Sequence, residues 1–418
     1  AGLSLTLMLA SCSEKPSERI QLSSDLMMAL TKQVSLNQPV EPVAVNIASD
    51  FDKAILQAVE ANDGYRAVLS SERAMMAGVG VAESVRRWQI AGTSTLGGIS
   101  ERGGRNPSNT TTGVAAGIQA SQLIYDGGES VANINSATAE AVGARVERTI
   151  IGNELALEAA RAWIDVWQYK EKLDLLDARS IEMETVVSQI ERMASNGMMD
   201  RAAVDSVRRK IVAISLEQAR LQSDLSQAQV RFTRFFNQKP AQMAMPTGLV
   251  TTSDAQAQAG AWQEAPVLQR NAVELIVAQN AVLAAKAAFE PKAKFQAGVN
   301  SPIQDGESTD ITLGLALEYN FGDGGRRESQ LSAAEAQMHS AKISLSDAQR
   351  SLKAEMDAAV QQLKAIELSM PLVARQITLS ASGAKTAKSQ LATGQANLNQ
   401  VIEAKIENYR AEVRQITM

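Results

Sequence analysis

The sequence is poor in cysteine and histidine, with one residue of each among its 418. A zinc site built from these residues needs three or four ligands and a disulfide needs two thiols, so neither can form within one chain. The histidine, His339, lies in a segment that predicts a helix, and we interpret it as a surface residue. We therefore expect no metal site, no cofactor and no enzymatic activity, and we interpret the many carboxylates as solvated helix faces.

Aromatic residues make up only 4% of the chain, and it contains only 10 prolines and 26 glycines. A hydrophobic content of 45% excludes a disordered protein, while the abundance of Ala, Gln, Glu, Ser and Leu favours long helices over a globular α/β enzyme. Basic residues are also in the minority, at 41 against 46 acidic ones, which gives a net charge of -5. This balance argues against a nucleic-acid-binding protein, because phosphate contacts need a basic surface.

No run of 18 uninterrupted apolar residues occurs, so we expect no transmembrane helix. If the chain spans a membrane, it must do so with β-strands. Residues 1–11 form a shorter apolar run that is typical of the central part of a signal peptide. The tetrad Leu9-Ala10-Ser11-Cys12 resembles a bacterial lipobox, in which the cysteine is lipidated. In such lipoproteins a serine in the place of Ser13 implies the outer membrane. We expect lipidation at Cys12 and a lipid-anchored linker over 12–49.

The chain contains an internal repeat. Asp126-Gly127-Gly128 recurs as Asp323-Gly324-Gly325, and Gly197 recurs as Gly394, both at an offset of 197 residues. Two landmarks that keep one spacing indicate a tandem duplication, in which each half reads helix, β-hairpin, very long helix, glycine and helix. The expected boundaries are a first repeat over 50–240, a linker over 241–264 and a second repeat over 265–418.

The longest predicted elements are helices over 128–195 and 326–393, in which the first proline is Pro371. A helix of about 68 residues is about 100 Å long and must pack lengthwise on a neighbour. We expect antiparallel hairpins with shorter helices over 199–236 and 397–418, and glycine turns between them. The last helix is shorter than its counterpart by about 15 residues. The first long helix carries an apolar stripe that includes Leu155, Trp163, Val166, Leu173, Leu176, Met183 and Ile190.

Two β-hairpins are predicted, over 89–124 and 293–321. The clearest strand runs from Ile311 to Phe321 and alternates strictly between apolar and polar or small residues. Strands of about 10 residues with one apolar face are typical of a transmembrane β-barrel, although a soluble half-buried hairpin would show the same alternation. Four strands are too few to close a barrel, for which about eight are needed, so we expect several chains to share one.

The order of these features resembles the TolC-like outer-membrane efflux proteins, the exit ducts of Gram-negative tripartite pumps and type I secretion systems. Further shared motifs are Asp52-Lys53-Ala54-Ile55-Leu56-Gln57-Ala58-Val59-Glu60-Ala61-Asn62, Ala265-Pro266-Val267-Leu268 and Gln400-Val401-Ile402-Glu403-Ala404. The resemblance implies a homotrimer with a 12-stranded β-barrel and a periplasmic tunnel of helices, an α-barrel. It also implies three kinds of partner: a periplasmic adaptor, an inner-membrane pump driven by ATP (an ABC transporter) or by protons, and outer-membrane lipid.

The resemblance also indicates candidate site residues at the turns between the paired helices. The expected docking surface for partner proteins comprises Gly197, Met198, Asp200, Gly394 and Gln395. The family commonly has acidic residues at the positions of Ala203, Gln400 and Glu403, and only Glu403 keeps a carboxylate here. We expect Gln400 and Glu403 at the pore entrance, with an ordinary exposed helix residue as the alternative for Glu403.

The cargo is predicted less directly than the duct. Tyr125-Asp126-Gly127-Gly128 resembles the type I secretion branch of the family, whereas a lipobox is commoner among drug-efflux ducts. Our prediction is an exit duct that leans to type I protein secretion, with multidrug or small-molecule efflux as the alternative. A periplasmic adaptor is less favoured because adaptors have one helical hairpin, and a structural coiled-coil protein would need neither strands nor a signal sequence.

Overall fold

The chain divides into two units, Ala1–Ala44 and Val45–Met418. The computed structural model describes residues 43, 45–47, 50–101, 109–196, 201–240, 245–246, 252–257, 260–301, 309–393 and 395–418. Val43 is the one described residue of the first unit, and all the helices and strands belong to the second.

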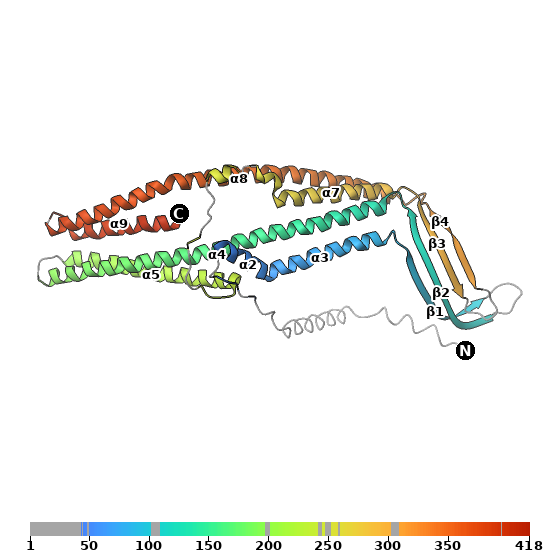
Figure 1. The fold of residues 1–418 in the computed structure, drawn as a ribbon, viewed down its shortest axis with the longest axis horizontal. Coiled ribbons are helices and arrows are strands. Elements are labelled where there is room, and N and C mark those ends of the chain that lie inside the picture. Colours follow the sequence, from blue (N-terminus) through green and yellow to red (C-terminus); the bar gives the residue numbers. More distant parts are fainter. Residues whose placement is uncertain are drawn as a thin grey trace. The chain divides into compact units, whose positions relative to one another are not determined.

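The second unit is mainly helical with a single four-stranded sheet, which confirms the expected fold class (Figure 1). The elements of the first repeat are α2 (Phe51–Ala61), α3 (Asp63–Ser84), β1 (Gln89–Glu101), β2 (Asn109–Tyr125), α4 (Glu129–Ser195) and α5 (Arg201–Phe236). Those that follow are α6 (Thr252–Ala257), the 3-10 helix η2 (Ala261–Glu264), α7 (Pro266–Ala287), β3 (Lys292–Ser301), β4 (Asp310–Glu318), α8 (Arg326–Ala392) and α9 (Leu398–Thr417).

The two long helices have the same length, 67 residues each, and each begins at the sheet (Figure 1). The helices α5 and α9 fold back along the far halves of α4 and α8 and form two antiparallel hairpins. The near halves of the long helices are covered by α3 and α7, the helices that lead into the two β-hairpins. The duplication is therefore visible in space, although α5 has 36 residues and α9 has 20.

The same turn joins the sheet to each long helix. Gly127 and Gly128 have φ values of 68° and 93°, and Gly324 and Gly325 have 68° and 86°, a region that disfavours any side chain. The carboxylate of Asp126 accepts hydrogen bonds from the backbone N–H of Gly128, at 3.1 Å, and of Ser130, at 2.7 Å. These bonds satisfy backbone donors at the start of α4, and Asp323 bonds its own helix in the same way.

The sheet is antiparallel throughout, in the order β1-β2-β3-β4. The apolar residues of β4 share one face with those opposite them on β3, where Leu315 pairs with Phe295 and Ile311 with Val299. That face is open, since Leu315 is 73% exposed and Leu96 on β1 is 83% exposed. The sheet thus presents a largely exposed apolar surface, on which Trp88 packs edge to face against Phe295.

The strand β4 ends at Glu318, so the prediction that it continues to Phe321 was wrong. Beyond Glu318 the backbone bonds locally instead of to β3. The guanidinium of Arg327 donates to the carbonyl of Asn320 at 2.8 Å, and the side chain of Asn320 accepts from the N–H of Gly322 at 3.2 Å. These bonds turn the chain towards α8, and Tyr319 and Phe321 pack edge to face in the turn.

The first repeat begins with two helices where one was expected. Asn62 separates them: its side chain accepts hydrogen bonds from the N–H groups of Gly64 and Tyr65 and so begins α3 afresh. The separate helix α2 packs its buried face on α4 and α5 around Trp163, which touches the rings of Phe51 and Phe236. This aromatic cluster is the main core of the unit. The segment expected to be a plain linker also contains structure, namely α6 and η2, which contact α8.

Candidate functional site at the ends of the helical hairpins

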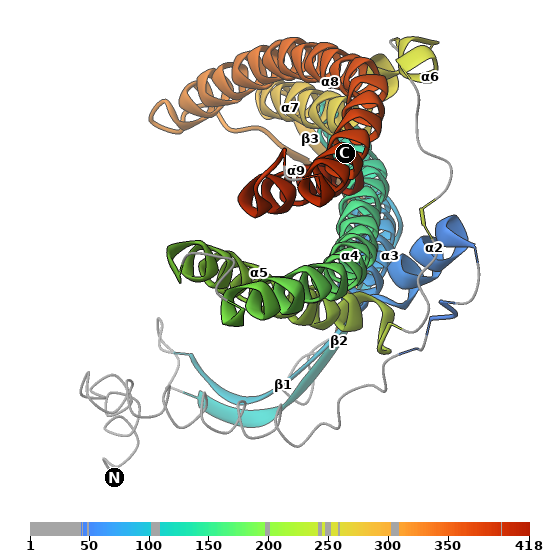
Figure 2. The same ribbon diagram turned by 90° about the vertical axis from the view of Figure 1, so that its left-hand side faces the viewer.

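The candidate site lies at the hairpin ends remote from the sheet, where α9 contacts α4, α5 and α8 (Figure 2). Here α9 begins with a capping box: Asn397 accepts from the N–H of Gln400 at 3.0 Å, and the Gln400 side chain accepts from the N–H of Asn397 at 2.9 Å. Leu398 and Ile402 then pack on Met183, Val204 and Val207. This small apolar cluster joins the second hairpin to the first.

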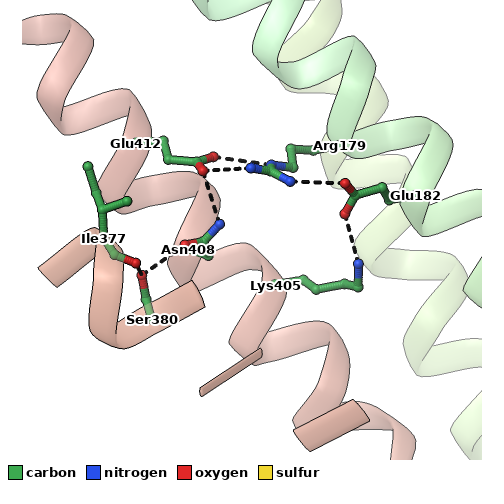
Figure 3. A network of polar contacts seen from close by, with 7 residues as sticks. All are labelled: Arg179, Glu182, Ile377, Ser380, Lys405, Asn408 and Glu412. Atoms are coloured by element: carbon green, nitrogen blue, oxygen red, sulfur yellow. Dashed lines mark hydrogen bonds and ion pairs between the residues drawn. The ribbon is translucent and has the colours of Figure 1, made fainter. Parts of the chain in front are cut away.

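A chain of charged side chains joins the hairpins above this cluster (Figure 3). The guanidinium of Arg179 on α4 donates to both carboxylate oxygens of Glu412 on α9, at 2.6 and 3.1 Å, and to Glu182 at 3.0 Å. Lys405 of α9 in turn donates to Glu182 at 2.9 Å. Fork-shaped arginine contacts of this kind fix both distance and direction. They therefore set the height of α9 against α4.

The network reaches α8 through two uncharged groups. The Asn408 side chain donates to Glu412 at 3.2 Å and accepts a hydrogen bond of 3.0 Å from the Ser380 hydroxyl (Figure 3). The single hydroxyl proton of Ser380 is shared with the carbonyl of Ile377 within its own helix, at 3.1 Å. One connected set of bonds therefore links α4, α9 and α8.

The electrostatics follow from these contacts. The hydrogen bond from Lys405 holds the pKa of Glu182 below its ordinary value, with smaller contributions from the nearby charges. The hydrogen bond to Glu412 raises the pKa of Arg179, so its charge is permanent. Burial raises the pKa of the Tyr409 hydroxyl to about 12, and the charge of Glu217 adds to the shift. At neutral pH Glu182 and Arg179 are thus charged, and Tyr409 is neutral.

Glu403 lies on the exposed side of α9 and is paired with the first hairpin. Its carboxylate accepts a hydrogen bond of 3.0 Å from the ammonium of Lys210 on α5, while 68% of its side chain stays exposed. Both residues line a groove of about 1190 Å³ between the hairpins, which α4, α5 and α9 supply with apolar and charged side chains alike. The described residues contain no cluster of three or more His, Cys, Asp or Glu side chains able to hold a metal ion.

No family model matches the sequence, and no curated protein matches it. Solved structures do. A membrane protein from Pseudomonas aeruginosa is 17% identical over 91% of this chain and 92% of that chain, with a TM-score of 0.79. The outer membrane protein VceC from Vibrio cholerae is 13% identical, covering 88% of this chain and 92% of its own, at a TM-score of 0.78. The CmeC outer membrane channel of Campylobacter jejuni is 11% identical, with coverages of 91% and 86% and a TM-score of 0.76.

The chain has the fold of outer-membrane channel proteins. The expected resemblance to TolC-like proteins is thereby confirmed for the fold, including the two helical hairpins and the four strands of the channel fold. None of the described helices combines the length and the hydropathy that crossing a membrane would require.

Within this channel fold the predicted site residues divide into two groups. Gln395, Gln400 and Glu403 are described, and all three are exposed at the end of the second hairpin. Gln400 has a structural task there, since it completes the capping box. The other predicted residues lie outside the described part of the chain: Cys12, Gly197, Met198, Asp200 and Gly394.

The residues that join the hairpins were not predicted from the sequence. Arg179 and Glu182 are three positions apart on α4, a spacing that indicates a surface ion pair but not a partner on another helix. The contact between Arg179 and Glu412 joins residues 233 positions apart, so no local sequence pattern predicts it. The pattern Asn397-Leu398-Asn399-Gln400 is a readable capping signal and could have been found.

Proposed function

We propose that this chain is one subunit of a trimeric outer-membrane channel, the exit duct of a tripartite export machine. The observation that carries the proposal is the exposed apolar face of the sheet at one end of two long helical hairpins. A lipid bilayer would cover such a face, while the long helices α4 and α8, each about 100 Å long, would reach across the periplasm. The likeness to outer-membrane channel proteins supports this arrangement.

The sheet itself supports a shared barrel. Its outer strands, β1 and β4, each pair on one side only within the described sheet. In lipid the remaining backbone groups of these edges must find partners, and four strands cannot close on themselves. Three copies, with β4 of one beside β1 of the next, give twelve strands and leave no edge. The open edges therefore require more than one copy, and the number three is what the resemblance to TolC-like proteins implies.

Outer-membrane insertion can be tested on the apolar face. Replacing Leu315 with arginine should cost about 2–4 kcal/mol of stability in a bilayer if the residue meets lipid at mid-depth. Thr312 is the matched control: it lies on the same strand, is exposed and points to the opposite face. We expect Thr312→Arg to leave unfolding in urea almost unchanged when both variants are folded into vesicles. Equal costs for the two variants would contradict a lipid-facing position for Leu315.

The proposal also covers the lipid anchor and the docking surface. Cys12 is the lipid anchor that follows a signal peptide. The periplasmic adaptor and the inner-membrane pump contact the docking surface, which comprises Gly197, Met198, Asp200, Gly394 and Gln395. The exposure of Gln395 supports the second point. Mass spectrometry of the membrane-extracted protein tests the first. We expect an acylated Cys12 at the mature N-terminus, and an unmodified Cys12 would overturn the anchor without affecting the duct.

For the cargo we propose type I protein secretion, with small-molecule efflux as the second candidate. The observation that favours secretion is the Asp-Gly-Gly turn present in both repeats, after Tyr125 and after Gly322. Deleting the gene should remove a protein from the culture supernatant and leave drug susceptibility unchanged. Higher drug susceptibility with an unchanged set of secreted proteins would instead establish the efflux role.

A further inference from the structure

The second long helix contains a proline in its interior. Pro371 lies within α8, which continues as one helix over Arg326–Ala392. A proline inside a helix has no backbone N–H, and its ring presses against the carbonyl of the residue four positions earlier, here Glu367. Such a position weakens the helix and allows it to bend. The first long helix, α4, contains no proline, so this weak point belongs to the second repeat alone.

The proline stands close to the level at which α9 ends. The guanidinium of Arg414 on α9 donates to the side chain of Gln376 on α8, at 2.9 Å. The two helices are antiparallel, so Thr417, the last residue of α9, lies close to the level of Pro371. The part of α8 between Pro371 and the sheet therefore has no α9 beside it.

The helix α7 stops short of the proline from the other side. Near the sheet the guanidinium of Arg327 donates to the carbonyl of Ala288, just beyond the end of α7. From there α7 runs back along α8 for 22 residues, which brings it to about residue 349 of α8. Among the described elements α8 contacts only α6, η2, α7 and α9. The stretch between the ends of α7 and α9 therefore has only the linker elements α6 and η2 beside it.

A hydrogen bond fastens the linker to this stretch of α8. The N–H of Thr252, the first residue of α6, donates to the carboxylate of Glu367 at 2.6 Å, and Thr252 is buried there. The first N–H groups of a helix have no partner within it, so the carboxylate caps α6 and holds it on α8 at the same time. Glu367 is also the residue whose carbonyl the ring of Pro371 crowds.

The first repeat differs at every one of these points. Its α4 contacts α2 and α5 around Trp163, and α5 has 36 residues where α9 has 20. At the offset of 197 residues, Lys170 stands in the place of Glu367 and Asp174 in the place of Pro371. The proline, the capping glutamate and the uncovered stretch thus occur together.

We propose that the linker helix α6 supports α8 at its proline: Glu367 holds α6 on the weak stretch, and this contact fixes the direction of α8 beyond Pro371. That part of α8 carries Ser380, whose hydroxyl bonds Asn408 in the polar network. The support therefore positions the end of the second hairpin, where the candidate site lies. The inference goes beyond the proposed function, because it holds for the chain whether or not the chain forms a duct.

Hydrogen exchange of the purified full chain, measured by mass spectrometry, tests this support. Glu367→Ala removes the acceptor, so the amides of α6 should exchange about tenfold to a hundredfold faster. The amides of α8 just beyond Pro371 should also exchange faster, because the weak stretch has lost its neighbour. Glu367→Gln keeps a neutral acceptor and should show smaller changes. The matched control is Glu335→Ala, an exposed glutamate on the same helix, which should change neither segment.

Pro371→Ala distinguishes support of the proline from an ordinary contact. This substitution restores the missing N–H, so α8 should no longer depend on α6. In this background Glu367→Ala should still speed exchange in α6 but no longer in α8. The inference is overturned if Glu367→Ala leaves either segment unchanged in the natural chain, or if its effect on α8 is the same with and without Pro371. The proposed channel stands in either case, since it rests on the sheet.

Discussion

At the residue scale, the network between the hairpins is a set of partly exposed ion pairs. They position α9 on α4 but add little to the stability of the folded chain. Arg179 contacts both Glu182 and Glu412, so one side chain ties two carboxylates on different helices. Exposed pairs contribute only about 0.2–1 kcal/mol each, because water screens them. The network therefore fixes the height of α9 on α4, while apolar contacts such as Leu398 with Met183 supply more of the stability.

Acid should weaken this network through Glu182. Its pKa is lower in the folded chain than in the unfolded chain, so its stabilising effect is complete above the ordinary value of 4.5 and is lost as the pH falls through the folded pKa. We expect Glu182→Gln to lower the unfolding temperature by about 1–2 °C near neutral pH and to have no effect in acid, below the folded pKa. Thermal unfolding across this pH range measures the difference, and a gap that stays constant would contradict it.

Glu403 is the other residue whose contacts make a prediction. In a trimer three such carboxylates would ring the pore entrance, each beside a Lys210 that offsets part of its charge. We expect Glu403→Gln to reduce cation preference in bilayer conductance, because Lys210 is left uncompensated, and Lys210→Gln to increase it. Glu407→Gln is the control and should change selectivity less. Unchanged ion selectivity in the Glu403→Gln variant would show that Glu403 is an ordinary exposed residue with no role in the pore.

At the element scale, the turns before α4 and α8 depend on glycines that no other residue replaces without strain. Gly325 has a φ of 86°, whereas Gly322, three residues earlier, has an ordinary φ and open space around it. We expect Gly325→Ala to cost about 1–2 kcal/mol in unfolding free energy and Gly322→Ala to cost little. Chemical denaturation of the two variants compares them. Equal effects would show that the left-handed conformation does not govern this turn.

Most helices and strands could be predicted from the sequence because the patterns that specify them are local. Asp126-Gly127-Gly128 and its repeat predicted the duplication, and a long stretch without proline before Pro371 predicted the helices. Asn62, which begins a new helix, was an equally local signal that went unused. The end of β4 was not readable, because the apolar alternation continues to Phe321 while the guanidinium of Arg327 turns the backbone at Asn320 away from the sheet.

At the scale of the whole molecule, much less followed from sequence. The contact between Arg179 and Glu412 depends on how the two hairpins are placed along each other, which periodicity within one helix does not record. The open edges of the sheet and its apolar face could be anticipated from Ile311, Leu313 and Leu315. The open edges and the apolar face predicted that several chains share one barrel. That assembly stays a prediction.

The central claim, that copies of this chain form a channel through a membrane, is tested most directly by conductance. The purified full chain is added to a planar lipid bilayer, and the current is recorded at fixed voltage. A trimeric duct predicts discrete and equal current steps that persist for the lifetime of the inserted protein. Protein that inserts into the bilayer without producing such steps would contradict the claim.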